Sequence, residues 1–383
     1  LNLYVDGRFG SFSTNRLDKK ELESLITNGI ESTRYLAVDE SRMLADPARY
    51  YKGGKPDLQL FDKKLYEVNP DDKVAIARAA AEEVLGKDER IISVDSSYSD
   101  GEGSSYRLIS NGFEGESKST WFSVSASVSI KGEGEARPQD YWYDSALFYD
   151  KLTKAGIGAK ALERVLRKLG QKKAKSGKYT MVVDPMNVGN LLSPMLSALY
   201  GSALQQKNSF LMDKLDTKVA SDLFTLRDEP HAIGANGSRY FDNEGVATEP
   251  RTVFDKGVLK TYFIDTYNGK KMDIAPTISA PSRLILTPGD KDLNGLVADI
   301  KQGILVTGFN GGNSNSSTGD FSYGIEGFLI EDGKLTQPVN EMNVTGNMVT
   351  LWNSLVAVGN DPQPNRSWQI PSLVFEGVDF SGL

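Results

Sequence analysis

A strict alternation of small apolar residues with serines is the feature that most constrains the fold of this chain. Apolar residues occupy every second position from 124 to 130, and serines fill the positions between them from 123 to 129. This period of two predicts a β-strand with one buried and one polar face. Two further apolar runs, 91–94 and 106–109, lead into the turn sequence Ser-Asn-Gly at 110–112. We therefore predict an antiparallel meander here.

Helix and turn signals precede this meander. A β-hairpin is predicted over residues 1–13, and a helix is expected over residues 18–28 with Gly29 as its stop. The best-marked helix follows Asn69, which can cap it, and ends at Gly86.

A connector rich in lysine, residues 171–178, predicts a domain boundary, which we place between residues 175 and 176. The predicted fold class is α+β. The N-terminal domain, 1–175, combines the meander with helices. The C-terminal domain, 176–383, is expected to be β-rich and barrel-like, with one long helix over residues 188–206. Because Leu1 already begins a strand-like sequence, we expect a further segment to precede it.

Composition excludes several kinds of chemistry. The 383 residues include no cysteine, which excludes disulfides, thiolate-bound metals and thiol catalysis. The single histidine, His231, excludes a two-histidine zinc site within one chain. A net charge of −7 argues against nucleic-acid binding through overall charge, and the basic cluster at 160–178 is interpreted as a solvated helix face. No apolar run is long enough to span a membrane, and we expect a cytoplasmic protein.

The longest run of glycine and small polar residues lies at positions 308–324. Such a segment is either an exposed surface loop or an ordered loop that lines a cleft. Three aromatic residues interrupt the run, namely Phe309, Phe321 and Tyr323. Aromatic side chains usually pack, so we favour the ordered loop.

Other motifs give weaker signals. His231 could meet a serine in space, but no spacing in the sequence supports a hydrolase triad. Asp242-Asn243-Glu244 and residues 310–320 offer oxygen ligands for Mg²⁺ or Ca²⁺, although acidic turn residues are common without a metal. The glycines at 156–161 fit a dinucleotide fingerprint, but no strand precedes them, which indicates the start of a glycine-containing helix.

Five segments together resemble the TldD/PmbA family, also called modulators of DNA gyrase, and they occur in the family's order. These segments are 4–15, 237–246, 257–262, 308–323 and 356–361. TldD-type chains of this family carry a His-Glu-x-x-x-His zinc motif. At the matching positions this chain has Ser197 and Ser202 in place of the histidines and Ala198 in place of the glutamate, while Ser367 lies about where a later cysteine ligand is expected.

The resemblance therefore implies a PmbA/TldE-type subunit that lacks zinc ligands, has no cofactor and is not catalytic alone. It implies a TldD-type zinc-bearing partner subunit and peptide substrates, either small or unfolded, such as microcin leader peptides and small antitoxins. In isolation we expect a homodimer. The candidate peptide-binding loop comprises Gly308, Phe309, Asn310, Gly311, Gly312, Asn313, Asp320 and Tyr323. Two alternatives remain open, namely an independent hydrolase that uses His231 or an oxygen-ligated metal, and a DNA gyrase-modulating binding protein.

Overall fold

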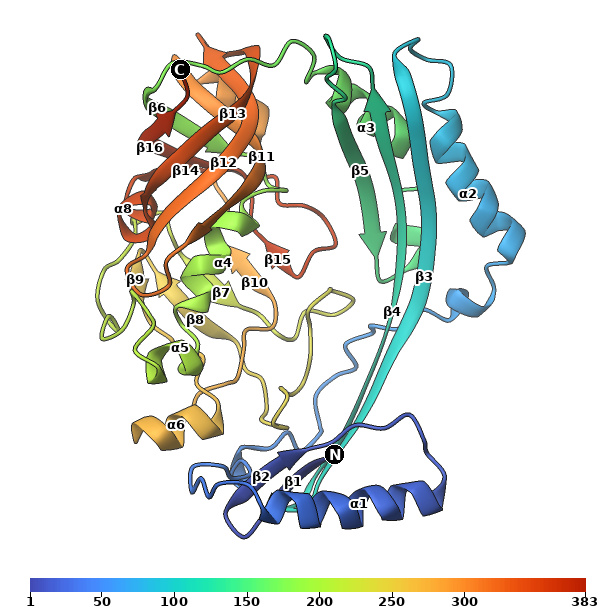
Figure 1. Ribbon diagram of the computed structural model, residues 1–383, viewed down its shortest axis with the longest axis vertical. Coiled ribbons are helices and arrows are strands. Elements are labelled where there is room, and N and C mark those ends of the chain that lie inside the picture. Colours follow the sequence, from blue (N-terminus) through green and yellow to red (C-terminus); the bar gives the residue numbers. More distant parts are fainter.

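The computed structural model describes all 383 residues, and the chain forms an α+β fold (Figure 1). At the N-terminus a two-stranded antiparallel hairpin packs on one helix. These elements are β1 (Asn2–Val5), β2 (Arg8–Ser11) and α1 (Lys19–Arg34). The hairpin predicted over residues 1–13 is confirmed.

Gly29 does not end α1, contrary to the prediction. The helix begins as expected, because Asp18 accepts a hydrogen bond from the backbone N–H of Glu21 at 3.0 Å. It then continues through Gly29 to Arg34. A Cβ atom at Gly29 would come within 3.0 Å of Leu3 Cδ1, so this glycine lets the helix approach the hairpin closely.

The predicted meander is confirmed as a three-stranded antiparallel sheet, with two helices packed on its apolar face. Its elements are β3 (Ile91–Ile109), β4 (Phe113–Ile130), β5 (Gln139–Ala146), α2 (Pro70–Glu82) and α3 (Ile157–Leu166). The alternating apolar residues from Val124 to Ile130 are buried, as the period of two requires. Asn69 caps α2 by accepting a hydrogen bond from the N–H of Asp72 at 2.9 Å. The two apolar runs before the turn are the ends of one 19-residue strand.

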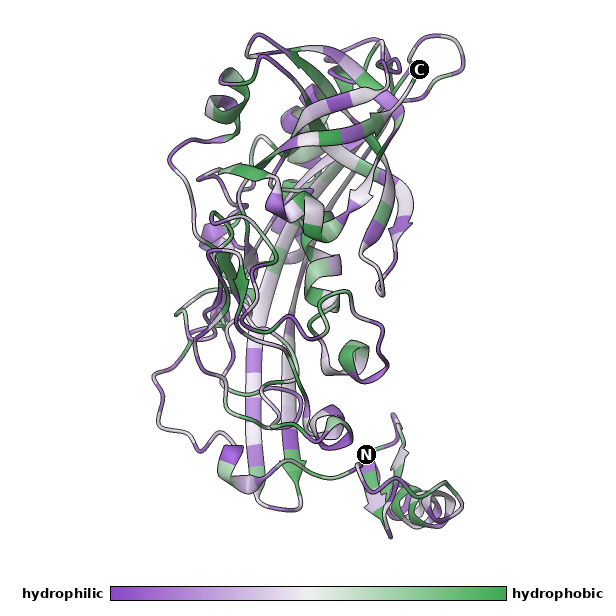
Figure 2. Cartoon of the chain, turned by 90° about the vertical axis from the view of Figure 1, so that its left-hand side faces the viewer, coloured by the Kyte–Doolittle hydropathy of each residue, from purple (hydrophilic) through white to green (hydrophobic).

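The hairpin of β3 and β4 extends far beyond its helices, toward the N-terminal hairpin and α1 (Figure 1). The distal half of the two strands is largely hydrophilic (Figure 2). Its end is held by Phe113, which is buried and packs edge-on against Phe241 at 5.0 Å and against Tyr50 at 5.2 Å between ring centroids. An aromatic cluster thus fixes the tip of an otherwise polar arm.

The C-terminal part contains a six-stranded sheet in the order β13-β12-β11-β6-β16-β14. A further pairing between β13 and β16 closes five of these strands into a barrel. The bounds are β6 (Gly177–Val183), β11 (Gln302–Ser314), β12 (Asp320–Glu331), β13 (Lys334–Asn347), β14 (Leu355–Val358) and β16 (Leu373–Ser381). One short helix, α7 (Leu293–Ala298), covers the outer face with apolar residues.

A second, smaller sheet has the order β15-β10-β7-β8-β9. Its strands are β7 (Leu226–Asp228), β8 (Arg251–Asp255), β9 (Val258–Leu259), β10 (Leu284–Leu286) and β15 (Trp368–Gln369). Two further helices are α6 (Thr266–Met272) and α8 (Met348–Asn353), and three 3₁₀ turns lie at Pro47–Arg49, Lys63–Tyr66 and Tyr149–Lys151.

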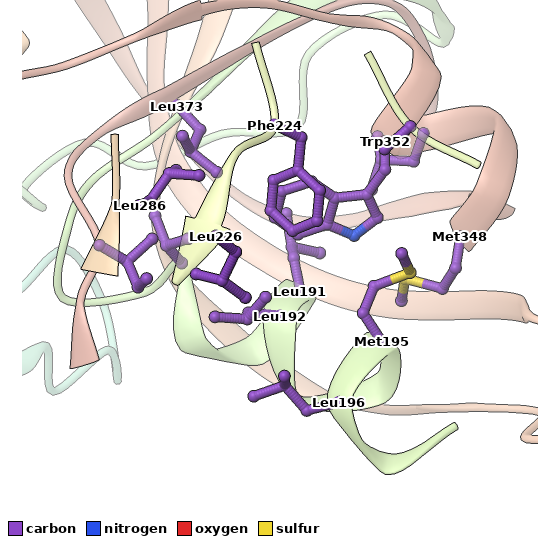
Figure 3. Packing of buried hydrophobic residues seen from close by; sticks show 14 of the residues in the cluster. Leu191, Leu192, Met195, Leu196, Phe224, Leu226, Leu286, Met348, Trp352 and Leu373 are labelled. Carbon is purple, nitrogen blue, oxygen red and sulfur yellow. The ribbon is translucent and has the colours of Figure 1, made fainter. Parts of the chain in front are cut away.

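The barrel and the smaller sheet share the largest hydrophobic core of the chain. At its centre Trp352 is fully buried, and its ring centroid lies 4.4 Å from that of Phe224 (Figure 3). Met195 lies beside Met348 in the same view. This core includes Met195, Leu196 and Ala198, so it holds the segment in which the residues matched to the zinc motif lie.

The single long helix predicted over residues 188–206 is wrong. Two short helices replace it, α4 (Gly189–Ser197) and α5 (Gly201–Gln205). Between them Tyr200 has an extended backbone, with φ −74° and ψ 141°, and forms an isolated β-bridge with Phe263. The next N–H, that of Gly201, donates to Phe263 O at 2.7 Å. A pairing with a distant segment therefore interrupts the helix.

Candidate functional site

The positions matched to the zinc motif lie at the break between α4 and α5. Ser197 is the last residue of α4, and Ser202 lies in α5; both are exposed. Ala198 is buried, and its carbonyl oxygen accepts a hydrogen bond from Ser209 Oγ at 2.6 Å. No group of three or more histidine, cysteine, aspartate or glutamate side chains in the chain is arranged to hold a metal ion. Serine and alanine do not supply the imidazole and thiolate donors that zinc sites use, so these residues do not fit zinc.

Ser367 lines a cavity of about 370 Å³ in another part of the fold. Gly237 lies directly against it, since a Cβ atom there would come within 2.7 Å of Ser367 Cβ. Arg239 also lines this cavity and donates a hydrogen bond to Ser282 Oγ at 2.8 Å. The 237–246 segment and Ser367, which lies near the C-terminus, therefore lie together around this cavity.

The candidate peptide-binding residues form a β-hairpin rather than a loop. Positions 308–313 belong to β11, whereas Asp320 and Tyr323 belong to β12. Only the tip, residues 315–319, turns, and Asn315 N–H donates to Asp320 O at 2.7 Å. Two β-bulges interrupt the pairing, and the second one places Gly311 and Gly312 at φ +72° and +92°. Two of the glycines therefore form a bulge in a strand. Composition alone does not distinguish such a bulged strand from a loop.

The hairpin tip is anchored on both sides. The Phe210 N–H donates to Ser316 O at 2.9 Å, and the Asn347 amide donates to Thr318 O at 2.8 Å. Along the strands, the ring of Tyr323 stacks on Phe321 with 5.4 Å between centroids. These contacts hold the two strands in one conformation.

One edge of β11 is open along the bulged segment. β6 pairs with β11 only from Gly303 to Val306, because β6 ends at Val183. From Gly308 to Ser314, β11 pairs with β12 alone. The backbone groups on the other edge of this segment therefore have no strand partner, which is the arrangement that accepts an extended peptide.

His231 is not arranged as a catalytic base toward a serine. Its Nε2 atom lies 3.0 Å from Thr248 Oγ1 and 3.3 Å from Lys55 Nζ, and no serine is among its hydrogen-bond partners. Burial, and then the positive charge of Lys55, lower the pKa of His231. The imidazole is therefore a neutral member of a polar contact between distant segments.

The acidic turn at 242–244 uses its oxygen atoms within the protein. Asp242 Oδ1 accepts hydrogen bonds from the N–H groups of Glu244 at 2.9 Å and Val246 at 3.0 Å. Glu244 Oε2 accepts from both the N–H and the hydroxyl of Thr266, each at 2.9 Å. Burial raises the pKa of Glu244. These carboxylates stabilise a turn and a helix start rather than converging on a cation position.

The basic cluster is only partly a solvated face, because Lys168 is buried and Arg164 is largely buried at the junction of the meander and the barrel. Arg164 Nε lies 3.2 Å from Asp140 Oδ1, and Lys168 Nζ lies 3.2 Å from Asp140 Oδ2. Lys168 also reaches Glu326 on β12. No sequence signal indicated this network, since its acidic members lie 24 or more residues away from their basic partners.

Comparison with known proteins agrees with this architecture. Two family models match, the PmbA/TldA metallopeptidase central domain over residues 63–169 and the PmbA/TldA metallopeptidase C-terminal domain over residues 176–382. The C-terminal match alone covers more than half of the chain. The protein belongs to the PmbA/TldD metallopeptidase family, which confirms the resemblance found in the sequence.

Individual relatives extend the match over the whole chain. The metalloprotease PmbA homolog of Haemophilus influenzae is 28% identical over 390 residues, covering 100% of this chain and 85% of the relative. A crystal structure from Bacteroides thetaiotaomicron that carries the name modulator of DNA gyrase is 73% identical, with a TM-score of 0.99, and the match covers 100% of this chain and 87% of that one. TldE from Thermococcus kodakarensis, at 22% identity and a TM-score of 0.81, shares the fold over 98% of this chain and 88% of its own.

Proposed function

We propose that this chain is a PmbA/TldE-type subunit that acts with a TldD-type zinc-bearing subunit in a protease for small or unfolded peptides. Family membership over both matched domains is the observation that carries the proposal. The composition supports the assignment of zinc to the partner subunit, because a chain with one histidine and no cysteine lacks the donors of the family's zinc site. The partner subunit then supplies the metal chemistry, and this chain contributes binding surface.

The open edge of β11 supports a role in holding the peptide. An extended peptide that pairs with residues 308–314 would satisfy backbone groups that have no strand partner in this chain. Main-chain pairing of this kind depends little on side-chain identity. It therefore suits a protease whose substrates share an unfolded backbone rather than a sequence motif.

We propose that the chain forms a homodimer when its partner is absent and that it works in the cytoplasm. No helix is both long enough and apolar enough to cross a bilayer. We also propose that a domain boundary lies between residues 175 and 176.

The proposal is tested by mixing the purified chain with a TldD-type subunit and measuring cleavage of an unfolded peptide. We expect co-elution on size exclusion, together with cleavage by the mixture that exceeds cleavage by either chain alone. His231→Ala is the matched control. It removes the single histidine of the chain, which lies outside the proposed binding edge, and it should leave the activity of the mixture unchanged. A partner that is equally active alone and does not associate with this chain contradicts the proposal.

A further inference from the structure

A cavity of about 490 Å³ is lined by cations and amides but by no carboxylate. Its positively charged residues are Lys151, Arg283 and Arg366. They come from three distant parts of the chain and converge although the chain as a whole carries more acidic than basic residues. Four amide side chains complete the polar lining, those of Gln59, Asn236, Asn365 and Gln369. This composition favours a negatively charged occupant.

The three cations have no anionic partner within the protein. None of them forms an ion pair: Glu229, whose charge acts to raise the pKa of Arg283, pairs instead with Arg227 at 2.7 Å. The side chains of Lys151, Arg283 and Arg366 also donate no hydrogen bond to another protein group, and Arg283 Nε is buried without any partner. Lys151 is exposed, whereas Arg283 and Arg366 are partly buried, and it is the two arginines whose unpaired charge is costly, because burial removes part of their hydration.

The surroundings of the two arginines agree with an unmet need for an anion. Burial lowers the pKa of both Arg283 and Arg366. The Arg366 guanidinium lies 4.4 Å from the ring centroid of Tyr143, a cation–π contact that does not supply an anion. An anion placed between the arginines would restore the interactions that burial removes.

We propose that this cavity binds a carboxylate of the peptide, an inference that rests on the proposed function. A carboxylate is planar and matches the forked donors of arginine, whereas the amides can donate to its remaining lone pairs. The volume exceeds that of a carboxylate, and Leu147, Phe148 and Ile233 offer apolar contact for the rest of a residue.

The position of the cavity is suited to a peptide. It shares Leu147 and Asn236 with the 370 Å³ cavity that Ser367 lines. A peptide anchored by its carboxylate at the arginines can therefore continue along the adjoining cavity. Either the terminal carboxylate or an acidic side chain supplies the same chemistry.

Three fluorescent hexapeptides distinguish the sources when their binding to the intact chain is measured by anisotropy. The first has a free C-terminus and neutral side chains, the second has an amidated C-terminus and one glutamate, and the third has neither carboxylate. We expect the first or the second to bind at least about tenfold more tightly than the third, a difference typical of a charged hydrogen-bonded pair. Arg283→Gln and Arg366→Gln should each abolish this preference, whereas Lys301→Gln, which removes an exposed unpaired charge elsewhere, should retain it.

Each other outcome counts against the proposal. Equal binding of all three peptides overturns the carboxylate site while leaving peptide binding intact, and the absence of any binding overturns the site altogether. Displacement by inorganic phosphate, at concentrations where acetate has no effect, identifies a phosphate site instead. Arg366→Lys keeps the charge but loses the fork, so a folded Arg366→Lys variant with full preference also contradicts the assignment. Failure of the proposed function is separate, because it shows as a lack of association with the TldD-type subunit.

Discussion

Lys168 Nζ lies 2.7 Å from Glu326 Oε1, and this ion pair joins the helical segment that follows the meander to a strand of the barrel. Both side chains are largely buried, with exposed fractions of 10% and 17%. Lys168 also contacts Asp140 on β5, so one ammonium group connects three elements. The contact therefore belongs to the packing of the two regions rather than to their solvated surface.

Removing the charge of Glu326 should destabilise the protein. Glu326→Gln leaves Lys168 buried with Asp140 as its only anionic partner, and we expect a loss of about 1–3 kcal/mol of unfolding free energy, below the full cost of an orphaned buried charge. Urea denaturation measures this loss. The matched control is Asp379→Asn, which breaks an ion pair with Lys178 whose side chains are 59% and 68% exposed. That change should cost less than about 1 kcal/mol. Equal stability losses in the two variants would contradict a structural role for Lys168–Glu326.

The second bulge of β11 should tolerate a methyl group at one glycine but not at its neighbour. Gly311 and Gly312 both have positive φ, but only at Gly312 would a Cβ atom collide with the carbonyl oxygen of Ser322 on β12. Gly311→Ala should cost about 1 kcal/mol from backbone strain alone, whereas Gly312→Ala should cost at least about 2 kcal/mol because the strand pairing must also shift. Thermal unfolding of both variants checks the difference. A Gly312→Ala protein as stable as Gly311→Ala would mean that the bulge is not fixed as described.

Asp184 should make stability depend on pH between about 4 and 6. Burial raises the pKa of this carboxyl to about 6, although hydrogen bonds from Asn187 oppose the shift. In this range the folded state binds a proton that the unfolded state has lost. The contribution of Asp184 to the free energy of unfolding therefore falls as the pH rises from the unfolded-state pKa to the folded-state pKa. Asp184→Asn keeps the acceptor oxygen without the charge. Its unfolding free energy relative to wild type should therefore rise from pH 4 to pH 7, by up to about 3 kcal/mol. A difference that is independent of pH contradicts a raised pKa.

Local signals in the sequence predicted several elements correctly, although the expected stop at Gly29 is not one of them, because α1 continues to Arg34. The cap at Asn69 and the alternation from Val124 to Ile130 depend on neighbouring residues, and both are found as predicted. The prediction of one helix over residues 188–206 was wrong because Tyr200 pairs with Phe263, more than sixty residues away. A helical pattern cannot report a competing long-range bridge.

The features of the candidate site also divide into those that the local sequence predicts and those that depend on distant segments. The sequence selected the glycine-rich stretch at 308–324, but its open edge exists because β6 stops at Val183, a neighbour set by topology. The cation-lined cavity gave no sequence signal at all, since Lys151, Arg283 and Arg366 are single charges in unrelated segments. Only the folded arrangement shows that they lack partners.

Removing divalent metal should leave the stability of this chain unchanged. A cation bound to the native state would raise the unfolding free energy by mass action, so its removal would lower the melting temperature. The carboxylates of the acidic turn at 242–244, those of Asp242 and Glu244, instead accept hydrogen bonds from Val246 and Thr266. We therefore expect the same melting temperature, within about 1 °C, in excess EDTA and in millimolar Mg²⁺ or Ca²⁺. Asp242→Asn, which keeps one acceptor oxygen, should respond to these additions as wild type does. Added cation could instead raise the melting temperature of the wild type but not that of Asp242→Asn. This result would support an oxygen-ligated metal and the independent hydrolase that depends on it.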